Sequence, residues 1–207
     1  TARFILSRFD LLLSQNDHMA QNLISLGADT ARVQPGGNLK AGAAALPVDA
    51  AAVEALRSDV GARPVWIASS THDGEEETIL AAHRTLLDRF PDLCLVLIPR
   101  HPERSDKVAE LIRDAELTFA RRSKGEAITP QTQVYLADTL GELGTFYALS
   151  PLVFLGGSLR PIGGHNPFEV AQAGAAVITG PGTSNFTETF PPLIAAGGAV
   201  EVQDAPG

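Results

Sequence analysis

The stretch that decides the fold is FLGGSLRPIGGHNPFE, which covers residues 154–169. It continues an apolar run that starts at residue 151 and is typical of a buried strand. Two pairs of glycines follow, and Asn166 then stands directly before Pro167, a combination that caps and starts a helix. The stretch therefore predicts a strand, a glycine loop and a helix that ends near Gly174.

The glycine loop of this stretch predicts a site for a phosphate. A loop between a strand and a helix exposes backbone N–H groups beside the positive end of the helix dipole, and both attract anions. The alternative interpretation is a strand-to-helix turn whose glycines only supply backbone angles that other residues avoid.

Composition excludes several classes of protein. The 207 residues are 44% hydrophobic, which suffices for a sizeable core and argues against disorder. The formal net charge of −8 argues against a general nucleic-acid-binding protein. The single cysteine, Cys94, lies in an apolar run and is interpreted as a buried strand residue instead of a nucleophile. No apolar stretch of the sequence reaches the length of a membrane span.

Strand-like and helix-like segments alternate along most of the chain. We predict strands over residues 65–68, 93–98, 117–120, 134–136, 151–155, 176–179 and 199–202. We predict helices over residues 49–60, 75–90, 105–115, 141–149 and 167–173. The alternation predicts an α/β fold with a parallel sheet and right-handed crossovers, in which ligands bind at the carboxyl ends of the strands.

The first forty residues are interpreted as the last strand, helix and strand of a preceding unit, with a buried strand at residues 11–13. An alanine-rich stretch over residues 41–46, closed by Pro47, is typical of a linker. Because the chain starts at a threonine and ends after a strand-like run, we expect it to be a piece of a longer protein. The polar segment 121–133 is predicted to be a surface loop without a chemical role.

Polar loops after the predicted strands supply the first candidate site residues. Arg100 and Arg104 belong to PRHPER, residues 99–104, and an arginine guanidinium suits a phosphate. Arg100 stands nearest the strand end, whereas Arg104 is expected on the surface of the next helix; a solvated turn is the alternative for the whole motif. Lys40 lies near glycines at the predicted hinge and either meets an anionic ligand or is an ordinary solvated lysine.

Two further segments predict contacts to a nucleotide. Gly141 lets the backbone approach a flat ligand closely, and Glu142 either contacts that ligand or is an acid that suits the start of a helix. Glu169 lies about one turn into the helix after the glycine loop, where a carboxylate can accept hydrogen bonds from ribose hydroxyls. The alternative for Glu169 is a solvent-facing helical acid.

The polar segment SSTHD, residues 69–73, has the residue types of a hydrolytic triad but lacks the flanking glycines of a nucleophile elbow. We expect its hydroxyl residues to form a loop that fills the floor of the cleft and caps the next helix. His72, Asp73, His101 and His165 could instead bind a metal ion, although no local spacing supports this.

Taken in order, these motifs resemble those of the Kdo transferases, which move 3-deoxy-D-manno-octulosonic acid (Kdo) from CMP-Kdo onto a lipid A precursor in lipopolysaccharide synthesis. The matching segments are ASSTHDGEE, PRHPER, DTLGEL, FLGGS and GGHNPFE, at residues 68–76, 99–104, 138–143, 154–158 and 163–169, followed by GP at 180–181 and NF at 185–186. Each motif is weak alone, but their common order is specific, and the resemblance covers nearly the whole chain.

The resemblance implies an α/β fold that is one half of a GT-B glycosyltransferase, in which two Rossmann-like domains face each other across a cleft. Residues 1–45 would be the tail of the acceptor domain with the linker, and residues 46–207 most of the donor domain. The whole enzyme would act at the cytoplasmic face of the bacterial inner membrane. We expect membrane contact only through an N-terminal part that this chain lacks, and we expect the chain itself to be soluble.

The resemblance also implies roles for particular residues. Lys40 resembles the residue thought to stabilise the transition state, and the family usually has methionine where Leu140 stands. The family's catalytic base is a glutamate of the acceptor domain, and no segment of this chain matches its motif, so we expect the chain alone to be inactive. The residues that correspond to the family's CMP contacts are Pro99, Arg100, Leu140, Gly141, Glu142, Asn166, Pro167, Phe168 and Glu169.

The implied enzyme is an inverting glycosyltransferase without a metal ion or cofactor. CMP-Kdo would be its donor substrate, and the missing acceptor domain would hold the lipid A precursor. Two alternatives stay open at this point: a GT-B enzyme that uses a UDP-sugar, and a fragment that binds a nucleotide without catalysing a reaction.

Overall fold

The structure of the protein is a computed structural model that describes residues 2–36 and 44–203. The chain divides into two compact units, Thr1–Ala44 and Ala45–Gly207. This division lies one residue from the predicted boundary between residues 45 and 46. The assignment of the two units to an acceptor and a donor domain stays a prediction.

The first unit pairs two short parallel strands, with Leu12 opposite Val33. Its residues 11–13 were predicted to be a buried strand, and the burial is wrong: Leu11 is 49% exposed and Leu13 is 57% exposed. A two-stranded sheet with so few helices cannot cover both faces of a strand. Its elements are α1 (Ala2–Leu6), β1 (Leu12–Ser14), α2 (Asp17–Ser25), the 3₁₀ helix η1 (Thr30–Arg32) and β2 (Val33–Pro35).

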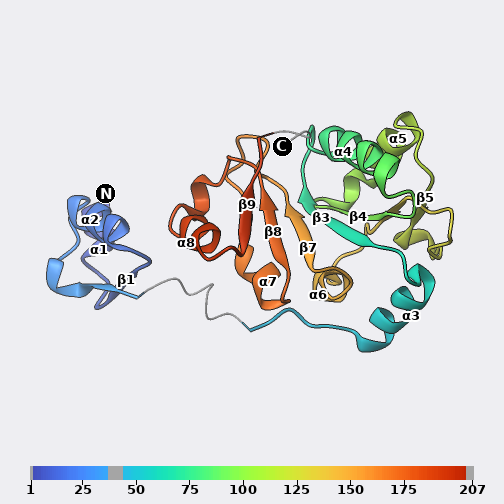
Figure 1. Cartoon of the computed structure of the whole chain (residues 1–207). Helices are drawn as coiled ribbons and strands as arrows, with labels where there is room; N and C mark the ends of the chain where they lie inside the picture. The colour runs from blue at the N-terminus through green and yellow to red at the C-terminus, as the bar shows by residue number, and fades with distance from the viewer. Residues whose placement is uncertain (1, 37–43, 204–207) are drawn as a thin grey trace. The chain divides into compact units, whose positions relative to one another are not determined.

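The second unit is built on a seven-stranded, wholly parallel sheet with the strand order β5-β6-β4-β3-β7-β8-β9 (Figure 1). The predicted parallel α/β sheet is therefore confirmed. Its strands are β3 (Val65–Thr71), β4 (Cys94–Pro99), β5 (Phe119–Arg121), β6 (Val134–Leu136), β7 (Leu152–Leu155), β8 (Ala176–Thr179) and β9 (Ala199–Glu201).

Helices follow the strands nearly as predicted. The exception is α8, which the sequence analysis missed because its two prolines are usually taken to exclude a helix. They stand in its first turn, where a helix tolerates proline. The helices are α3 (Ala50–Val60), α4 (Glu76–Arg89), α5 (Ser105–Asp114), α6 (Leu143–Tyr147), α7 (Pro167–Gln172) and α8 (Phe190–Ala195), with 3₁₀ turns η3 (Pro102–Arg104), η4 (Arg122–Lys124) and η5 (Ser184–Phe186). Within the described residues, none of the helices is long and apolar enough to span a membrane.

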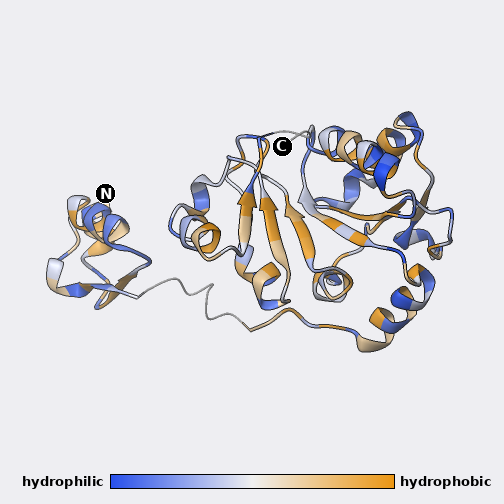
Figure 2. Cartoon of the chain, viewed as in Figure 1, coloured by the Kyte–Doolittle hydropathy of each residue, from blue (hydrophilic) through white to orange (hydrophobic). Residues whose placement is uncertain are grey.

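Both faces of the central sheet are buried, which explains why β4 and β7 are apolar throughout (Figure 2). Cys94 and Val96 of β4 face a core that includes residues of α3, α6 and α7. Leu95 and Leu97 face the opposite core, with residues of α4 and α5. Burial raises the pKa of the Cys94 thiol to about 11, so this cysteine is a core residue and not a nucleophile.

Strand β3 runs three residues farther than predicted, through Ser69, Ser70 and Thr71, which were expected to form a loop. Their backbone is paired: the Ser69 carbonyl accepts from Gly156 N at 2.8 Å, and the Thr71 carbonyl accepts from Arg100 N at 2.9 Å. The register shifts between Ser69 and Thr71, and Ser70 has a φ of 55°. The strand therefore ends in an irregularity at the carboxyl edge of the sheet, a place where function often concentrates.

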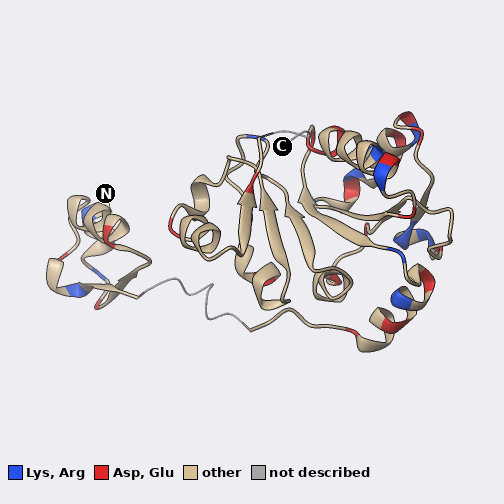
Figure 3. Ribbon diagram, in the orientation of Figure 1, with Lys and Arg blue, Asp and Glu red and all other residues tan. Residues whose placement is uncertain are grey.

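Charged side chains are spread unevenly over the second unit. Figure 3 shows them on α3, α4, α5 and the segment around β5, whereas β7 and β8 carry none. The arginines that can reach the carboxyl edge of the sheet consequently come mainly from the β4 and β5 side.

Candidate functional site

A pocket of about 280 Å³ lies at the carboxyl ends of β3, β4 and β7. Strand β3 stands between β4 and β7, so the chain reverses its direction of winding at this point. Crevices at such a switch point are where open α/β sheets bind ligands. The order of the strands thus forms the pocket, because this order brings together loops that are far apart in the sequence.

The structure gathers most of the predicted CMP contacts around this pocket. Glu142, Pro167 and Phe168 do not line it, and Pro167 is buried as the first residue of α7. Lys40 lies outside the described residues. Contact with CMP stays a prediction for all of them. The predicted residues that line the pocket are Pro99, Arg100, Leu140, Gly141, Asn166 and Glu169.

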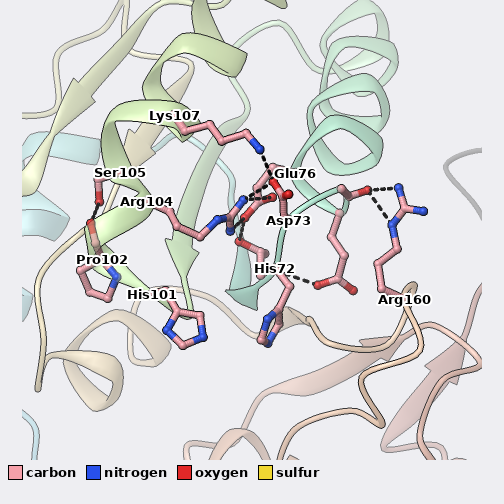
Figure 4. A network of polar contacts seen from close by, with 12 residues as sticks. His72, Asp73, Glu76, His101, Pro102, Arg104, Ser105, Lys107 and Arg160 are labelled. Carbon is pink, nitrogen blue, oxygen red and sulfur yellow. Dashed lines mark hydrogen bonds and ion pairs between the residues drawn. The ribbon is translucent and has the colours of Figure 1, made fainter.

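The two arginines of the PRHPER motif have different surroundings. Arg100 is exposed at the pocket, and among the described residues no hydrogen bond or ion pair engages its guanidinium group. Arg104 does not lie on the open helix surface as predicted. Its guanidinium is 2.9 Å from the carboxylate of Glu76, which is fully buried, and 2.8 Å from that of Asp73 (Figure 4). Arg100 is therefore available to a ligand, whereas Arg104 is committed to the fold.

The loop between β6 and α6 is held by Glu142. Its carboxylate accepts from Arg122 at 2.6 Å and also from the hydroxyl of Thr139. The ion pair with Arg122 lowers the pKa of Glu142. The prediction that segment 121–133 has no role beyond a surface loop is therefore incomplete, because Arg122 of that segment anchors this loop.

The tip of the same loop is open to a ligand. Leu140 is 78% exposed, and Gly141 has a φ of 82°, a conformation that favours glycine. No atom beyond its chain neighbours lies within 4 Å of the position that a Cβ of Gly141 would occupy. A flat ring can therefore approach this backbone closely.

The first half of the glycine loop is not available as a phosphate-binding site, contrary to the prediction. The carboxylate of Glu75 accepts hydrogen bonds from the backbone N–H groups of Gly157 at 2.7 Å, Ser158 at 3.0 Å and Leu159 at 2.9 Å. It also accepts from His72 N at 2.9 Å. Glu75 is 0% exposed, so the protein's own carboxylate occupies the place proposed for an anion.

The second half of the loop leads into α7 and faces the pocket. The Asn166 side chain accepts from Phe168 N at 3.1 Å, which confirms it as the predicted helix cap. The Asn166 amide also donates to Glu169 at 3.3 Å. Both side chains line the pocket, so the Glu169 carboxylate is placed to accept hydrogen bonds from a hydroxylated ligand.

Three histidines gather beside the pocket. His165 lines it, and its Nε2 lies 2.8 Å from Nε2 of His72, with nearly parallel ring planes and ring centroids 5.1 Å apart. His101 meets His72 edge-on at 5.7 Å. Burial, His72 and Arg100 lower the pKa of His165 to about 4. In the described part of the chain, no group of three or more histidine, cysteine, aspartate or glutamate side chains is arranged to hold a metal ion.

Ser70 lines the pocket, as expected for the hydroxyl residues of SSTHD, whereas Tyr147, which also lines it, was missed by sequence reasoning. Tyr147 is held by a hydrogen bond of 2.8 Å between its hydroxyl and that of Ser69. The positive φ of Ser70 has no sequence signal, because serine rarely adopts it. Tyr147 falls in the predicted helix, but its direction toward the pocket depends on tertiary packing.

A larger pocket, of about 450 Å³, lies in the first unit and has a different character. Its lining includes Arg3 and Arg32. The guanidinium of Arg32 donates to the carbonyls of Ser7 and Phe9 and pairs with Asp29 at 3.8 Å. Because this arginine already serves the fold of the unit, the pocket of the second unit is the better candidate site.

Comparison with known proteins identifies the family. No protein-family model matches the chain. A 3-deoxy-D-manno-octulosonic acid transferase of Haemophilus influenzae is 49% identical over 140 residues, which cover 68% of this chain and 33% of that protein. A transferase of the same name from Bordetella pertussis is 38% identical over 210 residues, which cover 98% of this chain and 48% of that protein. The chain thus spans less than half the length of these curated relatives.

A solved structure is similar as well. The crystal structure of the C-terminal CMP-Kdo binding domain of WaaA from Acinetobacter baumannii is 39% identical with a TM-score of 0.71, over 75% of this chain and 81% of that chain. The predicted Rossmann-like fold, one half of a GT-B glycosyltransferase, is confirmed. The chain belongs to the family of 3-deoxy-D-manno-octulosonic acid transferases, in which it corresponds to the C-terminal domain.

Proposed function

We propose that this chain forms the donor-binding half of an enzyme that transfers Kdo from CMP-Kdo onto a lipid A precursor. The observation that carries the proposal is the pocket itself, which is lined by six of the residues predicted to contact CMP. Support also comes from the similar domain of A. baumannii, which is named a CMP-Kdo binding domain.

In this proposal each side of the pocket holds one part of the nucleotide. The cytosine ring lies against the open backbone of Gly141. The Glu169 carboxylate accepts hydrogen bonds from the ribose hydroxyls. Arg100 donates to the phosphate, and a hydrogen bond to a charged group of this kind contributes roughly 1.5–3 kcal/mol.

The proposed reaction is an inverting transfer without a metal ion or cofactor. A glutamate of the acceptor domain takes the proton of the acceptor hydroxyl, whose oxygen attacks the anomeric carbon of Kdo. The bond between that carbon and the phosphate oxygen breaks, and CMP leaves. Arg100 offsets the negative charge that develops on the phosphate, and Lys40 is proposed to do the same.

The whole enzyme is proposed to act at the cytoplasmic face of the bacterial inner membrane, with the lipid A precursor bound by its other domain. This chain alone is proposed to bind the donor and to show no transfer, since no segment of it matches the motif of the base. Loss of a general base costs about 10²–10⁴ in rate.

Calorimetry with CMP, UMP and UDP tests the proposed nucleotide. We expect CMP to bind most tightly of the three. Tighter binding of UDP would contradict the proposal and favour an enzyme that uses a UDP-sugar. In a parallel assay, product formed by the purified chain from CMP-Kdo and a lipid A precursor would contradict the proposed division between the two domains.

A further inference from the structure

The contact between His72 and His165 joins the polar end of β3 to the second half of the glycine loop. Their Nε2 atoms are 2.8 Å apart, the ring planes differ by 6°, and the ring centroids are 5.1 Å apart. Gly157 makes this arrangement possible, because a Cβ at that position would lie 2.9 Å from Cδ2 of His165. The pair is thus built into the loop, and one of its members lines the pocket.

The short distance fixes the number of protons that the pair can hold. Two protonated Nε2 atoms would repel each other at 2.8 Å, and two unprotonated ones would leave the contact without a hydrogen bond, so one proton lies between them. Two neutral histidines carry two protons in total, so the second is on one of the two Nδ1 atoms. The contact therefore allows one additional proton, on the other Nδ1, and the pair then carries a single positive charge.

The surroundings oppose that additional proton in the free protein. Burial lowers the pKa of both histidines, and Arg100 lowers that of His165 further. The carboxylates near the pair favour the proton, but Glu75 is already engaged by four backbone N–H groups, and Glu76 is paired with Arg104. The charged and titratable groups whose charges act on the pair are Glu75, Glu76, Arg100, His101 and Arg104.

We propose that His72 and His165 act as one proton-sharing unit of the donor site and take up a single proton when a nucleotide phosphate binds beside His165. This inference rests on the proposed function, since it assumes that the pocket binds a nucleotide. A phosphate that neutralises Arg100 removes one of the charges that oppose the proton. The added charge of the pair then attracts the phosphate in turn, so binding and protonation favour each other.

Calorimetry of CMP binding at pH 7, in two buffers with different ionisation enthalpies, measures the protons taken up per CMP bound. At this pH CMP is mostly a dianion, because the second pKa of a phosphate is about 6. We expect wild type to take up a fraction of one proton, and its affinity to rise by at most about tenfold for each pH unit lowered. Cytidine lacks the phosphate and should bind without this uptake.

Variants assign the proton to the pair. His165→Phe and His72→Phe keep an aromatic ring but cannot share a proton. Both variants should therefore take up fewer protons per CMP bound than wild type. His18→Gln is the matched control, because it removes an exposed histidine of α2 that is not among the groups acting on the pair, and its proton uptake should equal that of wild type. Any proton released by CMP itself is common to all variants and cancels in the comparison.

A second measurement does not depend on the variants being folded. In wild type with ¹³C-labelled histidine, the Cε1–H signals of His72 and His165 should shift toward the protonated form with CMP and not with cytidine. CMP binding with the same proton uptake in wild type and the Phe variants, and with unshifted histidine signals, would overturn this inference alone. Failure of wild type to bind CMP would overturn the proposed function together with it.

Discussion

At the scale of single residues, the two arginines of the PRHPER motif have separate tasks. The guanidinium group of Arg100 lies at the pocket without a hydrogen bond or ion pair among the described residues, and that of Arg104 is 2.9 Å from the buried carboxylate of Glu76. Removing one member of a buried ion pair leaves an uncompensated charge, which costs about 3–5 kcal/mol. The same substitution should therefore have a different effect at each position.

We predict that Arg100→Ala weakens CMP binding by roughly 1.5–3 kcal/mol and leaves the free energy of unfolding nearly unchanged. Arg104→Ala should lower the free energy of unfolding by up to about 3–5 kcal/mol, because Glu76 loses its partner. Calorimetry with CMP and urea denaturation measure the two quantities. Equal losses of CMP affinity in two folded variants would show that the assignment is wrong.

Glu169 allows a second prediction at this scale. Glu169→Gln should reduce the preference for CMP over dCMP, because an amide oxygen accepts hydrogen bonds from ribose hydroxyls less strongly than a carboxylate does. The two affinities are compared by calorimetry in wild type and variant. A variant that keeps the full preference would show that Glu169 does not contact the ribose.

His83 gives a prediction about pH and stability. Trp66 donates to its Nδ1 at 3.1 Å, its Nε2 lies 3.0 Å from the Gln133 carbonyl, and burial lowers the pKa of His83 to about 4. The unfolded chain binds a proton here near pH 6.5, whereas the folded chain does so only near pH 4. The free energy of unfolding should therefore fall by about 2 kcal/mol for this histidine between pH 7 and pH 5.

Urea denaturation at several pH values between 5 and 7 checks this prediction. His83→Gln removes the titrating group and should show a smaller dependence on pH, whereas His18→Gln, on the exposed part of α2, should keep the dependence of wild type. A free energy of unfolding that is flat over this range in wild type would contradict the prediction.

At the scale of elements, the loop from Thr139 to Glu142 is positioned by a residue from another segment. Arg122 contacts the Glu142 carboxylate through two nitrogens, at 2.6 and 3.3 Å, and so holds the loop next to the pocket. We predict that Arg122→Ala lowers CMP affinity roughly tenfold, equivalent to about 1.4 kcal/mol, through a looser loop. Arg122→Lys keeps the positive charge but cannot make the contact through two nitrogens, so its CMP affinity should lie between those of wild type and Arg122→Ala. Unchanged CMP affinity in Arg122→Ala would contradict this role.

Sequence patterns predicted most elements but not all of their ends. The apolar runs of β4 and β7 are unambiguous, because a parallel strand with both faces buried needs apolar residues throughout. The extension of β3 over Ser69 to Thr71 was missed, since these hydroxyl residues are typical of loops until their partners in space are known. Helix α8 was missed for a similar reason, because its prolines are typical of turns.

The candidate site could be predicted only as far as local motifs reach. Arg100, Gly141 and Glu169 stand at the ends of recognisable elements, and the topology brings them to one pocket. Glu75 could not be predicted as the occupant of the glycine loop, since its partners lie 82 to 84 residues farther along the chain. His72 and His165 were considered together only as possible ligands of a metal ion, and their direct contact, between residues 93 apart in the chain, could not be predicted for the same physical reason.

At the scale of the whole molecule, the order of the strands decides where a ligand can bind. The sheet places β3 between β4 and β7, and the loops after these strands and after β6 enclose one pocket. The alternation of strands and helices predicts such a sheet, and the position at the carboxyl edge follows from it. The similarity in fold to the CMP-Kdo binding domain of A. baumannii extends over 75% of this chain.

Electron density for CMP, in crystals of this chain grown or soaked with the nucleotide, tests the central claim most directly. We predict that CMP lies in the pocket of the second unit, with the cytosine ring on the backbone of Gly141, the ribose hydroxyls at Glu169 and the phosphate within hydrogen-bond distance of Arg100. CMP bound elsewhere, for example beside Arg3 and Arg32 in the first unit, or an empty pocket at a CMP concentration that saturates binding in solution, would contradict it.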